Sequence, residues 1–220
     1  SKRQKELGVV LVDIGAGSTS IAVYEEGTIL HSAVIPVGGE NVTNDVAIGL
    51  KTQIETAERI KIEYGTCSPD EVSEKEMIDL SLISKADIHH VSRKTLAQII
   101  EARYHEIFSL VKNELAKVNR DGMLPAGVII TGGGAKMLGN VDLARETLSL
   151  PVQIGFPQNF EGIVEKMDDP SYSTAIGLLV WASRFEDAPI GISLGNIDFS
   201  KFKFGKTAES IKGWVKGLIP

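Results

Sequence analysis

Two short β-branched segments of the chain each lead directly into a run of glycines. Gly8 to Asp13 (GVVLVD) meets Gly15-Ala16-Gly17, and Gly127 to Thr131 (GVIIT) meets Gly132-Gly133-Gly134. Short apolar segments bounded by turn signals are typical of buried strands. The pattern therefore predicts one core in which two strands end at glycine turns.

The two turns lead into different structures. After the first, residues 20–24 alternate and residues 28–36 are again extended, so this turn predicts an antiparallel hairpin. After the second, residues 141–149 favour a helix, a short extended piece follows at 152–155, and residues 175–183 form an apolar helical pattern. Strands mixed with helices in this way indicate an α/β fold.

The intervening residues have helical periodicity. Thr43 to Leu50 suits a short helix, and Thr52-Gln53-Ile54-Glu55 predicts a capping box for a second helix that Gly65 ends. Residues 67–90 are acidic and weakly patterned, which predicts irregular or short-strand structure. Ser92 is expected to cap the longest helix. Its apolar residues keep the spacing of one buried stripe: Leu96, Ile99, Ile100, Tyr104, Ile107, Phe108, Val111, Leu115 and Val118.

These elements predict a core built from residues 7–42 and 125–185, interrupted by a mostly helical insertion at 43–124. In residues 186–206 the apolar positions follow neither the helical spacing nor the alternation of a strand. This segment also contains Pro189 and several glycines, so it is interpreted as a linker. Residues 207–219 then form a final amphipathic segment.

That final segment has one apolar stripe bordered by lysines. The stripe consists of Ile211, Trp214, Val215, Leu218 and Ile219, and the flanking residues are Lys212 and Lys216. A basic amphipathic helix with tryptophan is typical of an interfacial membrane anchor. The alternative is a terminal helix that docks on its own domain, and the linker favours the membrane anchor.

Composition narrows the classes of function. The chain has 220 residues, of which 43% are apolar and 24% charged, as in soluble globular proteins. No apolar run is long enough to span a bilayer, and a net charge of −6 argues against binding of nucleic acid. The single Cys67 excludes an internal disulfide and fits a reducing compartment. The chain opens with Ser-Lys-Arg instead of methionine, so it is expected to be a piece of a longer protein.

The first glycine turn, Asp13-Ile14-Gly15-Ala16-Gly17-Ser18-Thr19, has the composition of a phosphate loop. Glycines let the backbone approach a ligand, turned amides point at phosphate oxygens, and Ser18 and Thr19 offer hydroxyl donors. The carboxylate of Asp13 suits a magnesium ion held through water. A dinucleotide fingerprint is excluded because the third glycine and the following helix are missing. The alternative is a plain glycine-rich hairpin turn capped by aspartate.

The second turn, Gly132-Gly133-Gly134, lacks side chains where a planar ligand or a sugar would lie against the backbone. The alternative is an ordinary strand-to-helix turn. Because Asp13 and Gly132 both end strands of the same core, the two turns are expected to face one cleft.

Two further groups of polar residues carry less information by themselves. Glu58 and Lys61 share a helix face, where they are expected to form a surface ion pair. His89 and His90 have no companion ligands at metal spacing and are interpreted as surface residues.

Taken in order, several segments resemble the FtsA family of bacterial actin-like cell-division proteins. They are DIGAGST, VGGENVTNDVA, AERIKIEYG, TLAQIIEARYHEIFSLV, GVIITGGGAKMLGNVDLARETLSLPVQIGFP and YSTAIGLLVWA. The resemblance covers nearly the whole chain but only the second half of the family's proteins. It implies an actin-like ATPase (RNase H-like) fold, with subdomain 2A at residues 7–42 and 125–185 and subdomain 2B inserted at 43–124.

The resemblance also implies roles for single residues. Asp13 to Thr19 correspond to the second phosphate loop for ATP and Mg²⁺, and Gly132 to Gly134 lie against the adenosine. Glu58 and Lys61 match the ribose and adenine contacts, which reverses the interpretation as a mere ion pair. The first half of the family's proteins, which holds the first phosphate loop and the water-orienting residue, has no counterpart in this sequence.

The resulting hypothesis is an ATP-binding scaffold, not an enzyme, that ties the division protein FtsZ to the cytoplasmic face of the inner membrane. In the intact protein the resemblance implies self-association into filaments. The tail of FtsZ is expected to bind the long helix at Arg103 and Glu106, because Arg103 continues the apolar spacing from Leu96 and offers a fork to a carboxylate. An internal ion pair between Arg103 and Glu106 is the alternative. The alternatives for the whole chain are an ATP-dependent phosphotransferase of the sugar-kinase type and a pilus-assembly actin-like protein.

Overall fold

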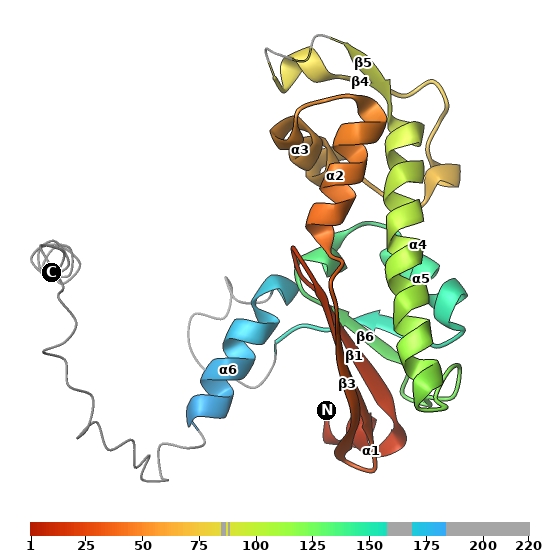
Figure 1. Cartoon of the computed structure of the whole chain (residues 1–220), viewed down its shortest axis with the longest axis vertical. Helices are drawn as coiled ribbons and strands as arrows, with labels where there is room; N and C mark the ends of the chain where they lie inside the picture. The colour runs from red at the N-terminus through yellow and green to blue at the C-terminus, as the bar shows by residue number, and fades with distance from the viewer. Residues whose placement is uncertain (85–86, 88, 158–168, 184–220) are drawn as a thin grey trace, which may run out of the picture. The chain divides into compact units, whose positions relative to one another are not determined.

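The computed structural model describes residues 1–84, 87, 89–157 and 169–183 (Figure 1). The chain divides into two compact units, Ser1–Val180 and Trp181–Pro220. The first unit contains the sheet and the candidate site. The expected linker at 186–206 and the expected membrane helix at 207–219 lie outside the described residues.

A five-stranded sheet in the order β3-β2-β1-β6-β7 forms the base of the first unit. Strands β1 (Val9–Ile14), β2 (Thr19–Glu25) and β3 (Thr28–Ile35) form the predicted antiparallel meander. Strand β6 (Val128–Thr131) pairs parallel to β1, and β7 (Val152–Ile154) pairs parallel to β6. The α/β fold class and the position of each of these strands are therefore confirmed.

The chain between β3 and β6 is mostly helical. It contains α2 (Gly39–Leu50), α3 (Ile54–Tyr64) and α4 (Arg93–Lys117). The weakly patterned segment forms the short helices η1 (Pro69–Glu71) and η2 (Leu80–Leu82) and a hairpin of β4 (Met77–Asp79) with β5 (His90–Ser92). In Figure 1, α4 extends from this hairpin to the sheet and runs beside α2.

Helix α4 confirms the predicted cap and stripe. The Ser92 hydroxyl accepts a hydrogen bond from the Thr95 amide, which satisfies one free amide of the first turn. Most of the predicted stripe is buried in the common core: Leu96, Ile100, Tyr104, Ile107, Phe108, Val111 and Leu115. Ile99 and Val118 lie at its margin and are half-buried.

Two helix starts differ from the prediction. Helix α2 begins at Gly39, four residues before Thr43 and before the expected boundary of the insertion, because the loop at Gly15 and Ala16 supplies its first hydrogen-bond partners. The capping box at Thr52 is wrong. The Thr52 amide donates to the carbonyl of Ala47 and so still belongs to the end of α2, and Gln53 is the residue before α3.

The remaining elements follow the predicted order. Gly132 leads into η3 (Gly133–Lys136), followed by α5 (Asn140–Leu148), η5 (Pro170–Tyr172) and α6 (Ser173–Ser183). The prediction missed α1 (Lys2–Leu7), which Ser1 caps. Within the described part of the chain, none of the helices combines the length and the apolar character needed to cross a membrane.

Candidate functional site

The two glycine turns lie next to each other at one edge of the sheet. In the parallel pair of β1 and β6, Asp13 is opposite Thr131, so the chain leaves both strands at the same level. Ligands of open α/β sheets bind at this carboxyl edge of parallel strands. Residues of both turns, Gly15 with Ala16 and Gly133 with Gly134, line one cavity of about 1090 Å³. The expectation that the two turns face one cleft is therefore confirmed.

In the first turn the backbone carbonyls accept hydrogen bonds within the protein, whereas three backbone amides have no acceptor among the described residues. The carbonyls of Gly15 and Ala16 accept hydrogen bonds of 2.9 and 2.8 Å from the amides of Gly39 and Glu40, the first residues of α2. Among the described residues, the amides of Ala16, Gly17 and Ser18 donate no hydrogen bond. Successive unpaired amides in a turn form a concave site for an anion. The turn therefore has three amides without a protein acceptor among the described residues, which are suitable donors for negatively charged oxygens.

The hydroxyls of this turn have separate roles. Ser18 lines a second cavity of about 390 Å³ beside the first. Thr19 is fully buried, and its hydroxyl donates over 2.8 Å to the carbonyl of Val37. The expectation of a ligand-facing hydroxyl at Thr19 is therefore wrong, because this group fixes the segment that leads to α2.

The carboxylate of Asp13 lines the second cavity. It accepts a hydrogen bond from the Thr174 hydroxyl, and its other oxygen lies against the backbone of Gly132. Among the described residues no group of three or more histidine, cysteine or acidic side chains is placed to hold a metal ion. A single carboxylate with nearby hydroxyls fits a hydrated magnesium ion, which commonly keeps several waters.

The three glycines of the second turn are not equivalent. A Cβ at Gly132, where φ is +82°, would lie 2.2 Å from Asp13 Oδ1, and a Cβ at Gly134 would lie 2.4 Å from Ile14 Cγ2. Both residues must be glycine because the turn packs against the end of β1. A Cβ at Gly133 would meet only Ser171 Oγ, at 3.8 Å, and Gly133 lines both cavities. Gly133 is thus the glycine of this turn at which an added side chain would extend into the cavities without overlapping protein atoms.

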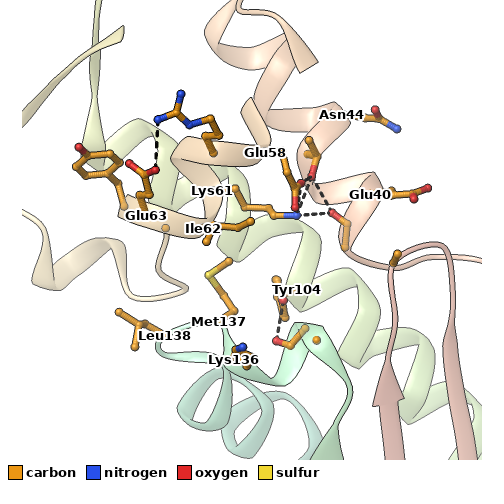
Figure 2. A pocket seen from close by; sticks show the side chains of 18 of the residues that line it. Glu40, Asn44, Glu58, Lys61, Ile62, Glu63, Tyr104, Lys136, Met137 and Leu138 are labelled. Carbon is orange, nitrogen blue, oxygen red and sulfur yellow. Dashed lines mark hydrogen bonds and ion pairs between the residues drawn. The ribbon is translucent and has the colours of Figure 1, made fainter. Parts of the chain in front are cut away.

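Glu58 and Lys61 of α3 form an ion pair on the opposite wall of the larger cavity (Figure 2). The ammonium of Lys61 donates to Glu58 Oε2 at 2.6 Å, to the Thr43 hydroxyl at 2.8 Å and to the Gly39 carbonyl at 3.2 Å. Burial opposes ionisation of Glu58, but hydrogen bonds from Lys61 and Thr43 outweigh it and hold the pKa of this carboxyl below its usual range. The predicted ion pair exists, and it also lines the cavity.

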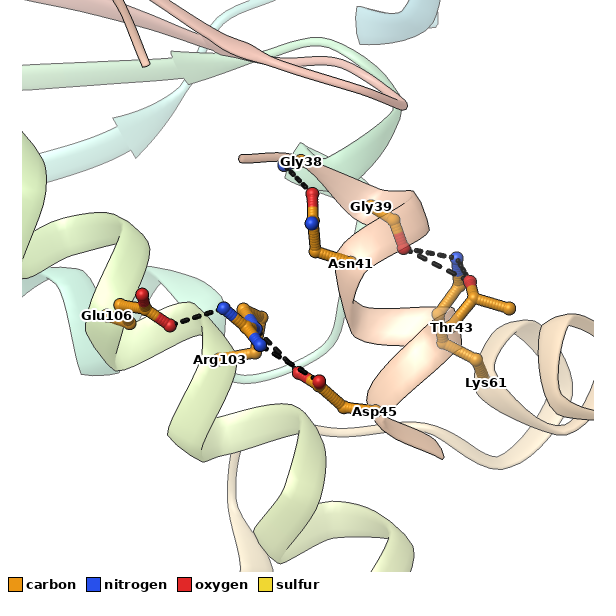
Figure 3. Close-up of polar contacts among 8 residues, drawn as sticks. All are labelled: Gly38, Gly39, Asn41, Thr43, Asp45, Lys61, Arg103 and Glu106. Carbon is orange, nitrogen blue, oxygen red and sulfur yellow. Dashed lines mark hydrogen bonds and ion pairs between the residues drawn. The ribbon is translucent and has the colours of Figure 1, made fainter. Parts of the chain in front are cut away.

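Arg103 and Glu106 lie on α4 and line neither cavity. Figure 3 shows their polar contacts. The guanidinium of Arg103 forms two hydrogen bonds with Asp45 of α2 and a third with Glu106. The internal ion pair considered as the alternative is therefore present, with Asp45 as an additional partner. Glu106 is half exposed, whereas the Arg103 side chain is 23% exposed.

Several residues that line the site were missed by sequence reasoning. Ser171 lines both cavities, Thr174 binds Asp13, and Thr43 joins the pair of Glu58 and Lys61. Thr43 and Thr174 lie in segments that carry the family resemblance, but nothing local in the sequence indicated that their hydroxyls, or that of Ser171, reach the site. His89 and His90 are exposed, as predicted. The proposed membrane residues between Ile211 and Ile219 lie outside the described residues.

Comparison with known proteins agrees with this geometry. The family model described as cell division protein FtsA matches residues 10–177. The chain is 39% identical over 215 residues to the cell division protein FtsA of Pseudomonas aeruginosa, covering 97% of this chain and 52% of that protein. It is 44% identical over 184 residues to the corresponding protein of Neisseria meningitidis, covering 83% and 44%. The chain thus spans about half the length of the curated relatives it matches.

A solved structure supports the fold independently. MreB5 of Spiroplasma citri bound to ADP superimposes with a TM-score of 0.61 at 19% identity, covering 83% of this chain and 55% of that chain. Identity this low shows the fold alone, which is that of the actin-like ATPases. Because the family model matches most of the sequence, the chain belongs to the FtsA family of cell-division proteins.

Proposed function

We propose that this chain supplies half of an ATP site in a division scaffold that ties FtsZ to the cytoplasmic membrane. The observation that carries the nucleotide assignment is the pair of glycine turns at the ends of β1 and β6, which open on one cavity. The family assignment favours this scaffold over a sugar-kinase-like phosphotransferase or a pilus-assembly protein. MreB5, which shares the fold, is bound to ADP in its solved structure, and this supports a nucleotide as the ligand class.

Each wall of the cavity suits one part of ATP. The unpaired amides of Ala16, Gly17 and Ser18 would bind phosphate oxygens. Gly133 would lie against the adenosine, and Glu58 and Lys61 would hydrogen-bond the ribose and the base from α3. Asp13 would hold Mg²⁺ through water, and the ion would supply positive charge beside the phosphates.

We expect this chain alone to bind magnesium-ATP weakly and to release no phosphate. The described residues provide one phosphate loop, and catalysis of phosphoryl transfer depends on positioning and on preorganised donors around the reacting group. Calorimetric titration with magnesium-ATP, combined with a phosphate-release assay, tests this expectation. Tight binding or steady turnover by the chain would contradict it.

The FtsZ contact is proposed on the exposed side of α4 at Arg103 and Glu106. The structure limits how this contact works, because Arg103 already binds Asp45 and Glu106. A carboxylate of the FtsZ tail would have to share the guanidinium or replace one of these partners. Glu106 is the more accessible of the two residues.

Attachment to the membrane is proposed for residues 207–219. In water this short segment with Gly213 and Gly217 is a poor isolated helix, so folding should accompany binding to anionic lipid. Trp214→Glu should abolish flotation of the chain with anionic liposomes, whereas Lys212→Gln should mainly increase the sensitivity to salt. If deletion of residues 207–220 leaves flotation intact, the segment is not the anchor.

A further inference from the structure

The carbonyl oxygen of Gly134, in the second glycine turn, accepts two hydrogen bonds from buried side chains. The Tyr104 hydroxyl of α4 donates over 2.9 Å, and the Asn140 side-chain amide at the start of α5 donates over 3.1 Å. Tyr104 is 2% exposed and Asn140 is 1% exposed, so both donor side chains are buried, while Gly134 itself lines the cavity. Figure 2 shows the Tyr104 bond at the cavity wall. The Met137 amide donates to the same carbonyl over 3.2 Å, so the peptide after Gly134 is held from α4, from α5 and from the residue that follows η3.

Tyr104 is suited to remain a donor. Its ring packs against Phe108, with ring centroids 6.1 Å apart, which fixes the direction of the hydroxyl. Burial, with smaller contributions from Cys67 and Glu58, raises the pKa of the phenol above its usual range. The hydroxyl therefore stays protonated at physiological pH and donates a hydrogen bond to the carbonyl of Gly134.

The other side of the turn leaves little room for movement. Gly134 packs so closely against Ile14 that a single added carbon would overlap the Ile14 side chain. The turn is therefore confined between the end of β1 and the hydroxyl of Tyr104. Removal of the hydroxyl would release one of these constraints, and the neighbouring Gly133 backbone at the cavity surface would be held less firmly.

The residue before Tyr104 connects the same helix to the first glycine turn. Arg103 binds Asp45 of α2 (Figure 3). The amides of Gly39 and Glu40, at the start of α2, donate to the carbonyls of Gly15 and Ala16. Two consecutive residues of α4 are thus linked by hydrogen bonds to both turns, Tyr104 directly and Arg103 through α2.

We propose that Tyr104 is a positioning residue of the nucleotide site, whose hydroxyl holds the second glycine turn in the form that accepts the nucleoside. The inference rests on the proposed nucleotide function and deepens it. It assigns to α4, a helix outside the sheet, control over the nucleoside side of the cavity. The phosphate side depends on α2 and does not use the Tyr104 hydroxyl.

The test compares Tyr104→Phe with Lys112→Met in the full chain. Lys112 also lies on α4 and also donates to a backbone carbonyl, that of Thr147, but it lines neither cavity. Affinities are measured for magnesium-ATP, adenosine and tripolyphosphate by chemical-shift titration. Loss of a hydrogen bond corresponds to about a threefold to tenfold change. The affinity of Y104F for ATP and for adenosine should fall by this factor, and its affinity for tripolyphosphate should equal that of the parent. Lys112→Met should leave all three affinities unchanged.

Amide hydrogen exchange provides a second readout that is independent of ligand. Residues 133–136 should exchange faster in Y104F and at the parent rate in Lys112→Met. Equal weakening of adenosine and tripolyphosphate would indicate general loosening of the fold and would overturn the positioning role. Parent-like adenosine binding by Y104F would overturn this inference alone. If the unmodified chain binds neither ATP nor adenosine, the proposed nucleotide function fails and the inference fails with it.

Discussion

Gly133 and Gly134 are adjacent in the sequence but differ in their surroundings, and this difference allows a sharp test of the proposed site. Gly133→Ala places a methyl group in open space, 3.8 Å from Ser171 Oγ. Gly134→Ala places the same group 2.4 Å from Ile14 Cγ2 and 2.8 Å from Ile14 Cβ. One change fills the ligand space and the other overpacks the protein.

The expected magnitudes depend on these distances. Forcing a methyl group into a filled core typically costs about 1–3 kcal/mol, so Gly134→Ala should lower the free energy of unfolding by that amount. Gly133 has no positive φ, and replacing such a glycine with alanine changes stability by about 1 kcal/mol or less, in the stabilising direction. Against a bound nucleoside the Gly133 methyl meets the same steric penalty of about 1–3 kcal/mol. This corresponds to roughly a fivefold to 150-fold loss of affinity.

Both variants are measured by urea denaturation and by titration with magnesium-ATP. Gly133→Ala should unfold at the urea concentration of the parent or slightly above it, and its affinity for nucleotide should fall. Gly134→Ala should unfold at a lower urea concentration. Tripolyphosphate is titrated as well, and because Gly133 also borders the cavity of Asp13 and Ser18, its affinity for Gly133→Ala should fall less than that of magnesium-ATP.

Two results would refute the reasoning. Parent-like nucleotide affinity in Gly133→Ala would mean that the ligand does not approach this turn. A large loss of stability in Gly133→Ala would mean that the space beside Gly133 is filled by protein and does not belong to the cavity.

Two further predictions concern charged side chains. Arg103→Ala should weaken binding of an FtsZ tail peptide and should also destabilise the fold by roughly 1 kcal/mol, because it removes the salt bridge to Asp45. Asp45→Asn breaks the same salt bridge but keeps the guanidinium. An equal loss of peptide affinity in both variants would argue against direct contact by Arg103. Hydrogen bonds from Lys136 and from the Ser171 amide lower the pKa of Asp169 to about 2, from an ordinary value of 3.8. A carboxyl group whose pKa is lowered on folding stabilises the fold at every pH above its ordinary pKa. This stabilisation is lost as the pH falls towards the lowered pKa. Asp169→Asn should therefore flatten the dependence of Tm on pH between about 4 and 2, and parallel curves for parent and variant would contradict this account.

Local sequence was sufficient to predict most elements and the two turns. Strands β1 and β6 were predicted because β-branched segments end at glycines, β2 and β3 because the residues after the first turn alternate and are again extended, and α4 because its apolar positions repeat along one face of the helix. The neighbouring positions of Asp13 and Gly132 were expected because both residues end strands of the same core, and the parallel pairing of β1 with β6 places them at one edge of the sheet. The elements and the turns themselves depend on residues close together in the chain, so periodicity and turn chemistry reveal them.

The tertiary structure decided which groups remain free for a ligand. Helix α2 starts at Gly39 because the carbonyls of Gly15 and Ala16 accept hydrogen bonds from its first amides. The Thr19 hydroxyl is not free for a ligand because it donates to the carbonyl of Val37. All three glycines of the second turn border a cavity, but Gly132 and Gly134 also pack closely against the end of β1, whereas a side chain at Gly133 would meet open space. Each of these outcomes depends on hydrogen bonds or close approaches between segments that are distant in the sequence. A local pattern shows which residues are able to bind a ligand, whereas the packing of distant segments determines which of them are already occupied.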